Sequence, residues 1–205
     1  MPPANGARIG VFGGTFDPPH VGHLVTAVNV RHALALDVVL LVVANEPWQK
    51  VGARIVTPAA DRLAMVRAAV GEVDGIEASA IEIERGGPSY TADTLAELAR
   101  RHPGAALFLV LGSDAAAGLS TWDRVDQVRR MATVVVVDRP GGATPALDGW
   151  RCERVEVPRL EVSSTDLRAR VADGRPLDYL ISPAVIDCIR GRGLYGSLAA
   201  AAERT

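Results

Sequence analysis

The chain has 205 residues, 48% of them hydrophobic, which is enough to enclose a substantial core. Its formal net charge is −2 and it has no long basic run, so we expect it not to bind nucleic acid. The apolar run at residues 38–44 is far shorter than the ~20 residues of a membrane span, and the N-terminus shows no evident secretory signal. We therefore expect no membrane partner and a cytoplasmic location. Cys152 and Cys188 form no CxxC pattern and are expected to be reduced thiols.

Strand-like and helix-like stretches alternate along the chain. The first half predicts a strand at residues 8–12, a helix beginning near His20, a buried strand at 37–44, a polar loop at 45–57, a helix at 58–70, a strand at 76–84 and a helix at 90–101. The second half predicts a strand at 106–111, helical pieces up to Met131, a buried strand at 133–137, a loop at 139–148, a strand at 154–157 and helices at 164–172 and 183–192.

This alternation predicts an α/β fold, a Rossmann-like doubly wound parallel sheet with helices on both faces and a small C-terminal helical portion. No linker or internal repeat divides the chain, so we expect a single domain over residues 1–205, with 1–7 and 197–205 flexible. Ligands of such sheets bind beyond the carboxyl ends of the strands. The oligomeric state is left open, and a homo-oligomer is one of the outcomes.

The stretch GGTFDPPHVGHL, residues 13–24, directly follows the first strand and leads into a helix. Gly13 and Gly14 let an anion approach the backbone, and the helix start adds free N–H groups and a positive dipole end. His20 and His23 are three residues apart, so both rings share one face and can donate hydrogen bonds to a reacting phosphoryl group. The alternative is that both histidines are ordinary first-turn residues.

Other phosphate and metal motifs fit this stretch poorly. The glycines at 10, 13 and 14 do not complete a G-x-G-x-x-G dinucleotide fingerprint, and the Gly-Lys-Ser/Thr of a P-loop is absent. Asp17, His20 and His23 are a conceivable zinc set, but no HExxH and no further ligand stand out. A phosphate site therefore remains the better interpretation.

Residues 13–23 resemble the (H/T)xGH signature of the nucleotidyltransferase superfamily, and their flanks resemble the bacterial nicotinate-nucleotide adenylyltransferases. The resemblance runs from about residue 8 to residue 196. The tetrapeptide is shared by several adenylyl- and cytidylyltransferases, so it indicates the reaction and not the substrate. The resemblance as a whole implies that ATP and nicotinate mononucleotide are joined, with release of pyrophosphate, to make the dinucleotide precursor of NAD.

Residues 162–168, VSSTDLR, resemble the family's ISSTxxR motif. The hydroxyl residues stand at a helix start, where they are natural caps, and Arg168 lies one turn further on with a planar fork for an anion. From the residues alone a plain helix cap is the preferred interpretation. The resemblance implies instead that Ser164, Thr165 and Arg168 hold the β and γ phosphates of ATP.

Residues 87–95, GPSYTADTL, resemble the family segment whose tyrosine–threonine pair recognises the nicotinate carboxylate, which here is Tyr90-Thr91. A simple capped helix start is an equal alternative. Residues 111–122 resemble the GxDxxxxLxxW pattern, in which Trp122 stacks on the pyridine ring, although core packing is the ordinary role of a Trp. Residues 45–50 depart from the family's loop, which ends in PPHK, because Trp48-Gln49 precede the lysine.

The resemblance thus implies two sets of binding residues. Those for ATP are Gly13, Gly14, Thr15, Phe16, His20, His23, Gly112, Asp114, Arg139, Ser164, Thr165 and Arg168, of which His20 and His23 are catalytic. Those for nicotinate mononucleotide are Asn45, Lys50, Tyr90, Thr91 and Trp122. Mg²⁺ is expected to arrive with ATP and to have few or no protein ligands.

Three other functions remain open. The acceptor can be another phosphorylated compound, such as nicotinamide mononucleotide, pantetheine phosphate or FMN. The chain can be a nucleotide-binding sensor without turnover, although intact His20, His23 and Arg168 speak against this. An NAD-dependent dehydrogenase ranks last, because the dinucleotide fingerprint is missing. The preference for the acid over the amide mononucleotide and the conformation of residues 46–50, including whether Trp48 covers the site, are not decided by the sequence.

Overall fold

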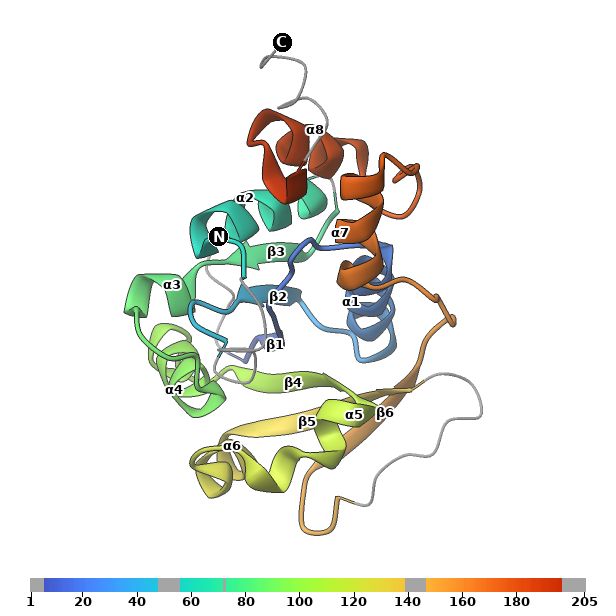
Figure 1. The fold of residues 1–205 in the computed structure, drawn as a ribbon. Helices are drawn as coiled ribbons and strands as arrows, with labels where there is room; N and C mark the ends of the chain where they lie inside the picture. The colour runs from blue at the N-terminus through green and yellow to red at the C-terminus, as the bar shows by residue number, and fades with distance from the viewer. Residues whose placement is uncertain (1–5, 48–55, 72, 139–146, 197–205) are drawn as a thin grey trace.

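The computed structural model describes residues 6–47, 56–71, 73–138 and 147–196. Within these residues, one sheet of six parallel strands has the order β3-β2-β1-β4-β5-β6 (Figure 1). Its strands are β1 (Arg8–Gly14), β2 (Val38–Val43), β3 (Ile76–Ser79), β4 (Ala106–Gly112), β5 (Ala132–Asp138) and β6 (Cys152–Glu156). The order reverses between β1 and β4, so the switch point, where such sheets bind ligands, lies at the carboxyl ends of these two strands.

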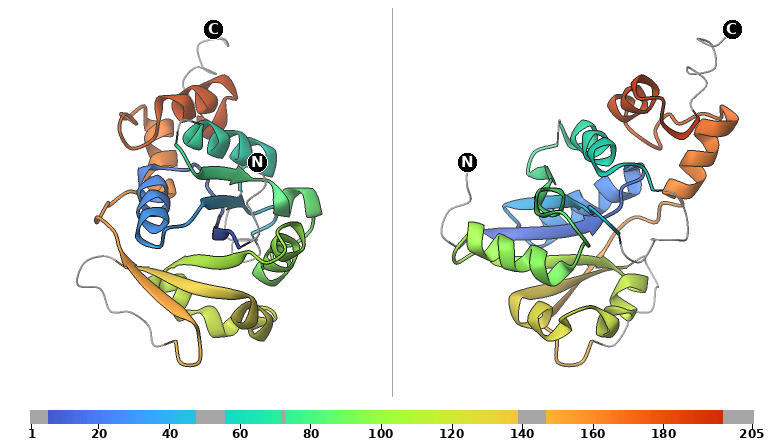
Figure 2. Two further views of the ribbon diagram at one scale, coloured as in Figure 1. Left: turned by 180° about the vertical axis from the view of Figure 1, so that it is seen from behind. Right: turned by 60° about the vertical axis from the view of Figure 1, so that its left-hand side comes forward.

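Helices cover both faces of the sheet (Figures 1 and 2). One face packs against α1 (Val21–Ala33), α2 (Ala59–Val70), α7 (Ser164–Asp173) and α8 (Pro183–Gly191). The other face packs against α3 (Ile81–Arg85), α4 (Thr91–Arg101), α5 (Ser113–Ala117) and α6 (Val125–Met131). Short 3₁₀ turns are η2 (Leu119–Thr121) and η3 (Leu194–Gly196). The predicted doubly wound α/β fold is confirmed, and α7, α8 and η3 form its C-terminal helical portion.

The buried strands supply both halves of the core. In β4, Phe108 and Val110 belong to the apolar cluster on one face, and Leu107, Leu109 and Leu111 belong to the cluster on the other. Successive side chains of a strand point to opposite faces, so a continuous apolar run is what a sheet covered on both sides requires. The prediction of buried strands from such runs is confirmed.

The predicted strand at residues 76–84 is wrong in its second half. β3 ends at Ser79, whose Oγ accepts a hydrogen bond from the backbone N–H of Ile81 (3.4 Å), and the chain then turns into α3. Gly86, with φ of 72°, ends that helix. Apolar alternation over so few residues fits one helical turn as well as a strand, and the side-chain bond at the turn decides between them.

β1 is longer than predicted. Gly13 and Gly14 still pair with Val42 and Val43 of β2, so the two glycines end the strand and do not follow it. The other predicted strands and helices are present, with ends that shift by one or a few residues. Parts of the predicted loops at 45–57 and 139–148, and most of the predicted flexible ends, lie outside the described residues.

Two further findings concern the chain as a whole. Both cysteines are free thiols, as predicted, with Cys152 exposed and Cys188 half-buried. Among the helices of the described residues, none has the length and apolar character needed to cross a membrane.

Candidate active site at the carboxyl ends of β1 and β4

The two histidines after β1 form a stacked pair. His20 is the N-cap of α1, and its ring lies over that of His23 with the centroids 3.8 Å apart. The backbone N–H of His20 donates a hydrogen bond to Nδ1 of His23 (3.2 Å), which fixes the orientation of the second ring. The prediction that both rings share one face is confirmed.

Small and aromatic neighbours hold this pair in place. Phe16 is buried, has φ of 50° and packs its ring edge-on against His23, with the centroids 4.9 Å apart. A Cβ on Gly14 would lie 2.7 Å from the Phe16 ring, and one on Gly22 would lie 3.1 Å from Nδ1 of His20. These two glycines therefore make room for rings, whereas a Cβ on Gly13 would meet only open space.

His20 is uncharged at neutral pH. Desolvation by burial lowers its pKa from the usual 6.5 to about 4. Its Nδ1 is buried and has no hydrogen-bond partner among the described residues, which is a costly state for a polar atom. Both rings line a cavity of about 210 Å³ together with Gly112 of β4 and Asp138 of β5. An unsatisfied ring nitrogen beside a cavity is suited to a polar ligand atom.

The second motif docks onto the first. Ser163, not Ser164, caps α7, because its Oγ accepts from the backbone N–H of Asp166 (3.2 Å). The Ser164 hydroxyl instead donates to the carbonyl oxygen of Pro18 (2.8 Å). Arg168 donates to the carbonyl oxygen of Asp17 (2.7 Å) and to Oγ1 of Thr165 (3.2 Å). The plain cap interpretation therefore fails for Ser164, and the structure brings the two motifs together.

A second cavity of about 250 Å³ lies on the other side of the β1 strand end. It combines a glycine-rich wall, an aromatic side chain and the start of α4. The lining residues are Gly13, Gly14, Thr15, Ala44, Pro47, Glu82, Ser89, Tyr90, Thr91, Leu109, Leu111, Ala115, Trp122 and Asp123. Three of the residues predicted for the mononucleotide, Tyr90, Thr91 and Trp122, thus lie together. Gly13, Gly14 and Thr15, predicted for ATP, line this cavity.

The start of α4 is open toward this cavity. Its N-cap is Tyr90, and no side chain caps the first N–H groups in the part of the chain that the structure describes. Ser89 is occupied elsewhere, since its Oγ accepts from the backbone N–H of Asn45 (2.9 Å), while the Asn45 amide donates to the Gly87 carbonyl oxygen (3.0 Å). The capped-start alternative is therefore wrong. An uncapped helix start with its positive dipole end suits a carboxylate.

Other predicted residues are placed differently. The Phe16 side chain is buried beneath His23, and Asp114 is exposed on α5 and outside both sets of lining residues. Lys50 and Arg139 lie outside the described residues, as does Trp48. The zinc alternative is not supported, because no cluster of three His, Cys, Asp or Glu able to hold a metal occurs among the described residues.

Arg62 was not predicted from the sequence, although this residue bonds to the loops that follow β1 and β2 and to the segment before α2. It is 1% exposed, and its guanidinium donates to the carbonyl oxygens of Thr57 (2.7 Å), Thr15 (2.9 Å) and Asn45 (3.1 Å). One signal was available. Arg62 stands on the same helical face as Met65, and this face is buried, so its charge requires partners.

Glu82 and Thr94 form a buried pair behind the second cavity. The Thr94 hydroxyl donates to Oε1 of Glu82 (2.5 Å), and Arg85 donates to the same hydroxyl oxygen (3.3 Å). On the side of the first cavity, buried Asp138 accepts from the hydroxyl of Ser113 (2.5 Å) and pairs with Arg154 (2.9 Å). Neither pair has a sequence signal beyond polar residues near strand ends.

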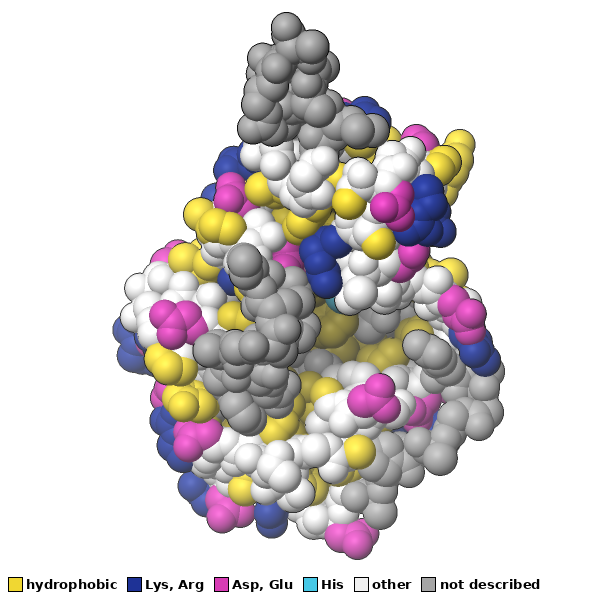
Figure 3. Space-filling view, in the orientation of Figure 1, with side chains coloured by type: hydrophobic (Ala, Val, Ile, Leu, Met, Phe, Trp, Pro, Cys, Tyr) yellow, Lys and Arg dark blue, Asp and Glu magenta, His cyan; other side chains and the backbone are white. Residues whose placement is uncertain are grey.

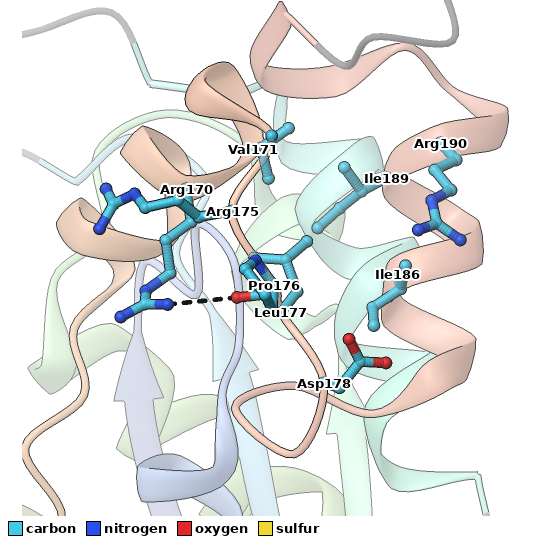
Figure 4. A pocket seen from close by; sticks show the side chains of 10 residues that line it. Arg170, Val171, Arg175, Pro176, Leu177, Asp178, Ile186, Ile189 and Arg190 are labelled. Carbon is cyan, nitrogen blue, oxygen red and sulfur yellow. Dashed lines mark hydrogen bonds between the residues drawn. The ribbon is translucent and has the colours of Figure 1, made fainter.

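The surface shows where the site opens. Figure 3 shows a hollow with hydrophobic side chains at its floor, a histidine side chain at its upper edge and a basic side chain above it. Another cavity of about 290 Å³ lies between α7 and α8 (Figure 4), where Arg170 donates to the Pro176 carbonyl oxygen (3.2 Å). It contains none of the predicted site residues.

Comparisons with known proteins place the chain in a family. The cytidylyltransferase-like family model matches residues 11–170. A probable nicotinate-nucleotide adenylyltransferase of Corynebacterium kroppenstedtii is 43% identical over 195 residues, covering 93% of this chain and 92% of that protein. Another from Roseiflexus sp. is 46% identical over 197 residues, covering 92% and 98%. The solved Plasmodium falciparum nicotinic acid mononucleotide adenylyltransferase complexed with NaAD matches with a TM-score of 0.77 at 19% identity, covering 93% and 98%. At that identity the likeness concerns the fold.

Proposed function

The chain belongs to the cytidylyltransferase-like family, and we propose that it transfers the adenylyl group of ATP to nicotinate mononucleotide, forming nicotinate adenine dinucleotide and pyrophosphate. One observation carries this proposal. Two cavities flank the carboxyl ends of β1 and β4, and one holds the stacked histidines while the other holds Trp122 and the open start of α4. Two nucleotides that enter from opposite sides bring their phosphates together at these strand ends.

ATP occupies the cavity of the histidine pair. The uncharged His20 ring and His23 hold oxygens of the α-phosphate and stabilise the charge that develops there. The first turn of α7, with Ser164 and Thr165, and the fork of Arg168 hold the β and γ phosphates. ATP enters as its magnesium complex, because Mg²⁺ keeps most of its water and binds well to phosphate oxygens.

Nicotinate mononucleotide occupies the cavity of Trp122. The indole face stacks on the flat pyridine ring. The N–H groups at the start of α4, around Tyr90 and Thr91, bind the ring carboxylate. Its 5′-phosphate then points toward Gly13, where the backbone is bare and a Cβ would meet nothing within 4 Å.

The reaction needs no nucleophile from the protein. The 5′-phosphate oxygen attacks the α-phosphorus of ATP in line, and the bond to the β-phosphate breaks as magnesium pyrophosphate leaves. The protein contributes alignment of the two phosphates and neutralisation of the transition-state charge.

Coupled pyrophosphate release tests the function. The purified protein is incubated with MgATP and either nicotinate mononucleotide or nicotinamide mononucleotide, with pantetheine phosphate and FMN as further acceptors. We expect pyrophosphate and dinucleotide in equal amounts, and faster turnover with the acid. Faster use of the amide or of another acceptor would contradict the acceptor assignment, and ATP binding without pyrophosphate release would identify a sensor.

A further inference from the structure

A tyrosine at the C-terminal end of the described chain reaches the loop that carries the histidine pair. Tyr195 of η3 is half-buried, and its ring packs against the apolar cluster beside α2. Its hydroxyl donates to Oδ1 of Asp17 (2.6 Å) and lies 3.7 Å from Sδ of Met65. Tyr195 is not among the described residues that line the two cavities at the strand ends, so we do not expect it to contact either nucleotide.

Asp17, which accepts the hydrogen bond from Tyr195, is buried and held by further contacts. The residue is 1% exposed, and a carboxylate at that depth requires hydrogen-bond donors. Oδ2 accepts from the backbone N–H of Thr57 (3.4 Å), and the Asp17 carbonyl oxygen accepts from Arg168 (2.7 Å). Tyr195 thus completes a set of contacts from three separate parts of the chain.

The position of Asp17 determines the position of His20. Only Pro18 and Pro19 lie between them, and proline rings restrict the backbone, so a displacement of Asp17 passes along a stiff segment. The Pro18 carbonyl oxygen also receives the Ser164 hydroxyl (2.8 Å). A misplacement of about 1 Å at reacting groups can cost as much as ~100-fold in rate.

From this geometry, and resting on the proposed function, we propose that Tyr195 is a positioning residue, whose hydroxyl anchors Asp17 and thereby sets the place of the His20–His23 pair in the ATP cavity. Burial and the neighbouring Asp17 carboxylate raise the pKa of Tyr195 well above its usual value, so the hydroxyl remains a donor at all pH values at which the protein works.

The test removes one oxygen atom. Tyr195→Phe keeps the packed ring and deletes the donor, and Tyr179→Phe makes the same change at a tyrosine that is 96% exposed. We expect Tyr195→Phe to lower kcat about tenfold and to leave KM for nicotinate mononucleotide within twofold of wild type. Tyr179→Phe keeps the wild-type values. Rates are expressed per folded molecule, with folding followed by circular dichroism.

A double-mutant cycle identifies the path of the effect. If Tyr195 acts through the Asp17 carboxylate, Tyr195→Phe changes kcat by less than twofold in an Asp17→Ala background. If the two substitutions instead lower kcat independently, so that their effects multiply in the double variant, Tyr195 does not act through Asp17. A Tyr195→Phe enzyme with wild-type kcat per folded molecule would also overturn the assignment, and would make the tyrosine only an anchor of the C-terminal segment.

Histidine NMR signals give a second readout that does not depend on turnover. We expect the ring signals of His20 and His23 to shift in Tyr195→Phe, while those of His32 and His102 stay in place. Unchanged signals of the pair would refute the inference even if the wild-type protein releases no pyrophosphate. Absence of release by the wild type refutes the proposed function alone.

Discussion

The individual side chain with the most direct role in the proposed reaction is His23, which stacks on His20 at the cavity proposed for ATP. We expect His23→Ala to lower kcat on the order of 10²–10³-fold, because one preorganised donor to the transition-state charge is lost. The matched control is His32→Ala, an exposed histidine in the last turn of the same helix. Steady-state pyrophosphate release measures both. Near-normal turnover of a folded His23→Ala protein would remove His23 from the mechanism.

His20 makes the stability of the protein depend on pH. Its folded pKa of about 4 lies below the value of 6.5 that an exposed histidine has, so the unfolded chain binds more protons between these two values. The free energy of unfolding therefore falls as the pH drops from about 6.5 toward 4, by an amount on the order of 2 kcal/mol for this ring.

Chemical denaturation at pH 7 and pH 4.5 measures this effect, with His20→Gln as the comparison. Other titrating groups contribute equally to both proteins, so the difference between their two losses isolates His20. We expect the wild type to lose more stability than the variant on acidification. Equal losses in both proteins would show that the ring is not desolvated in solution.

At the same scale, the sequence indicates which residues are suited to bind phosphates, but not which other side chains hold those residues in place. The spacing of His20 and His23 is enough to predict that they share a face. The contacts of Arg62 with the carbonyl oxygens of Thr15 and Asn45, and of Tyr195 with Asp17, join positions far apart in the chain. No local pattern encodes such contacts, because their partners are backbone atoms or distant side chains.

Among the elements, α1 depends on a glycine in its first turn. A Cβ on Gly22 would lie 3.1 Å from Nδ1 of His20 and 3.2 Å from Cγ1 of Val162, so alanine must push the ring or its neighbour aside. We expect Gly22→Ala to lower kcat/KM about tenfold. Helix propensity works in the opposite direction, since alanine in place of glycine in a helix contributes about 0.5–1 kcal/mol of stability.

Activity and stability are therefore expected to change separately in Gly22→Ala, with kcat/KM lowered and the melting temperature kept or raised. Gly71→Ala is the control, because a Cβ there would lie 3.5 Å from the carbonyl oxygen of Arg67, which is an ordinary van der Waals distance. An active Gly22→Ala enzyme would mean that His20 can move without cost to the reaction.

The long apolar strands and the helices with clear boundaries follow from local pattern, which is why β2, β4 and β5 were predicted within a residue or two of their ends. α3 was not, because the residues IEIER alternate like a strand while their buried glutamate finds its partner, Thr94, in α4. The same limit applies to the capping of α7 and α4. Of the hydroxyl residues predicted at the start of α7, Ser163 caps the helix but Ser164 bonds to the distant Pro18 carbonyl oxygen. At the start of α4, Ser89 bonds to the distant backbone N–H of Asn45.

For the molecule as a whole, the cavity proposed for ATP and the motif at the start of α7 come from distant parts of the sequence. We therefore expect ATP binding to stabilise the entire chain against unfolding. A non-reacting ATP analogue with Mg²⁺ at 100 times its Kd is expected to add about 2.7 kcal/mol, which raises the melting temperature of a chain of this size by about 5–10 °C.

The melting shift is expected to shrink in Arg168→Ala, which lacks the proposed phosphate fork, and to persist in Arg67→Ala, an exposed arginine near the amino end of β3. Differential scanning fluorimetry with and without the analogue measures the shift for each protein against its own baseline. An unchanged shift in Arg168→Ala would place the triphosphate elsewhere.

The hydroxyl of Ser164 meets a carbonyl 146 positions earlier in the chain. This has a consequence for synthesis on the ribosome. The sheet strands and the turn with His20 and His23 are synthesised before α7 and Tyr195. A nascent chain can therefore complete its six strands before α7, one wall of the proposed triphosphate pocket, has been made. We expect nucleotide not to stabilise a polypeptide that is stalled before α7.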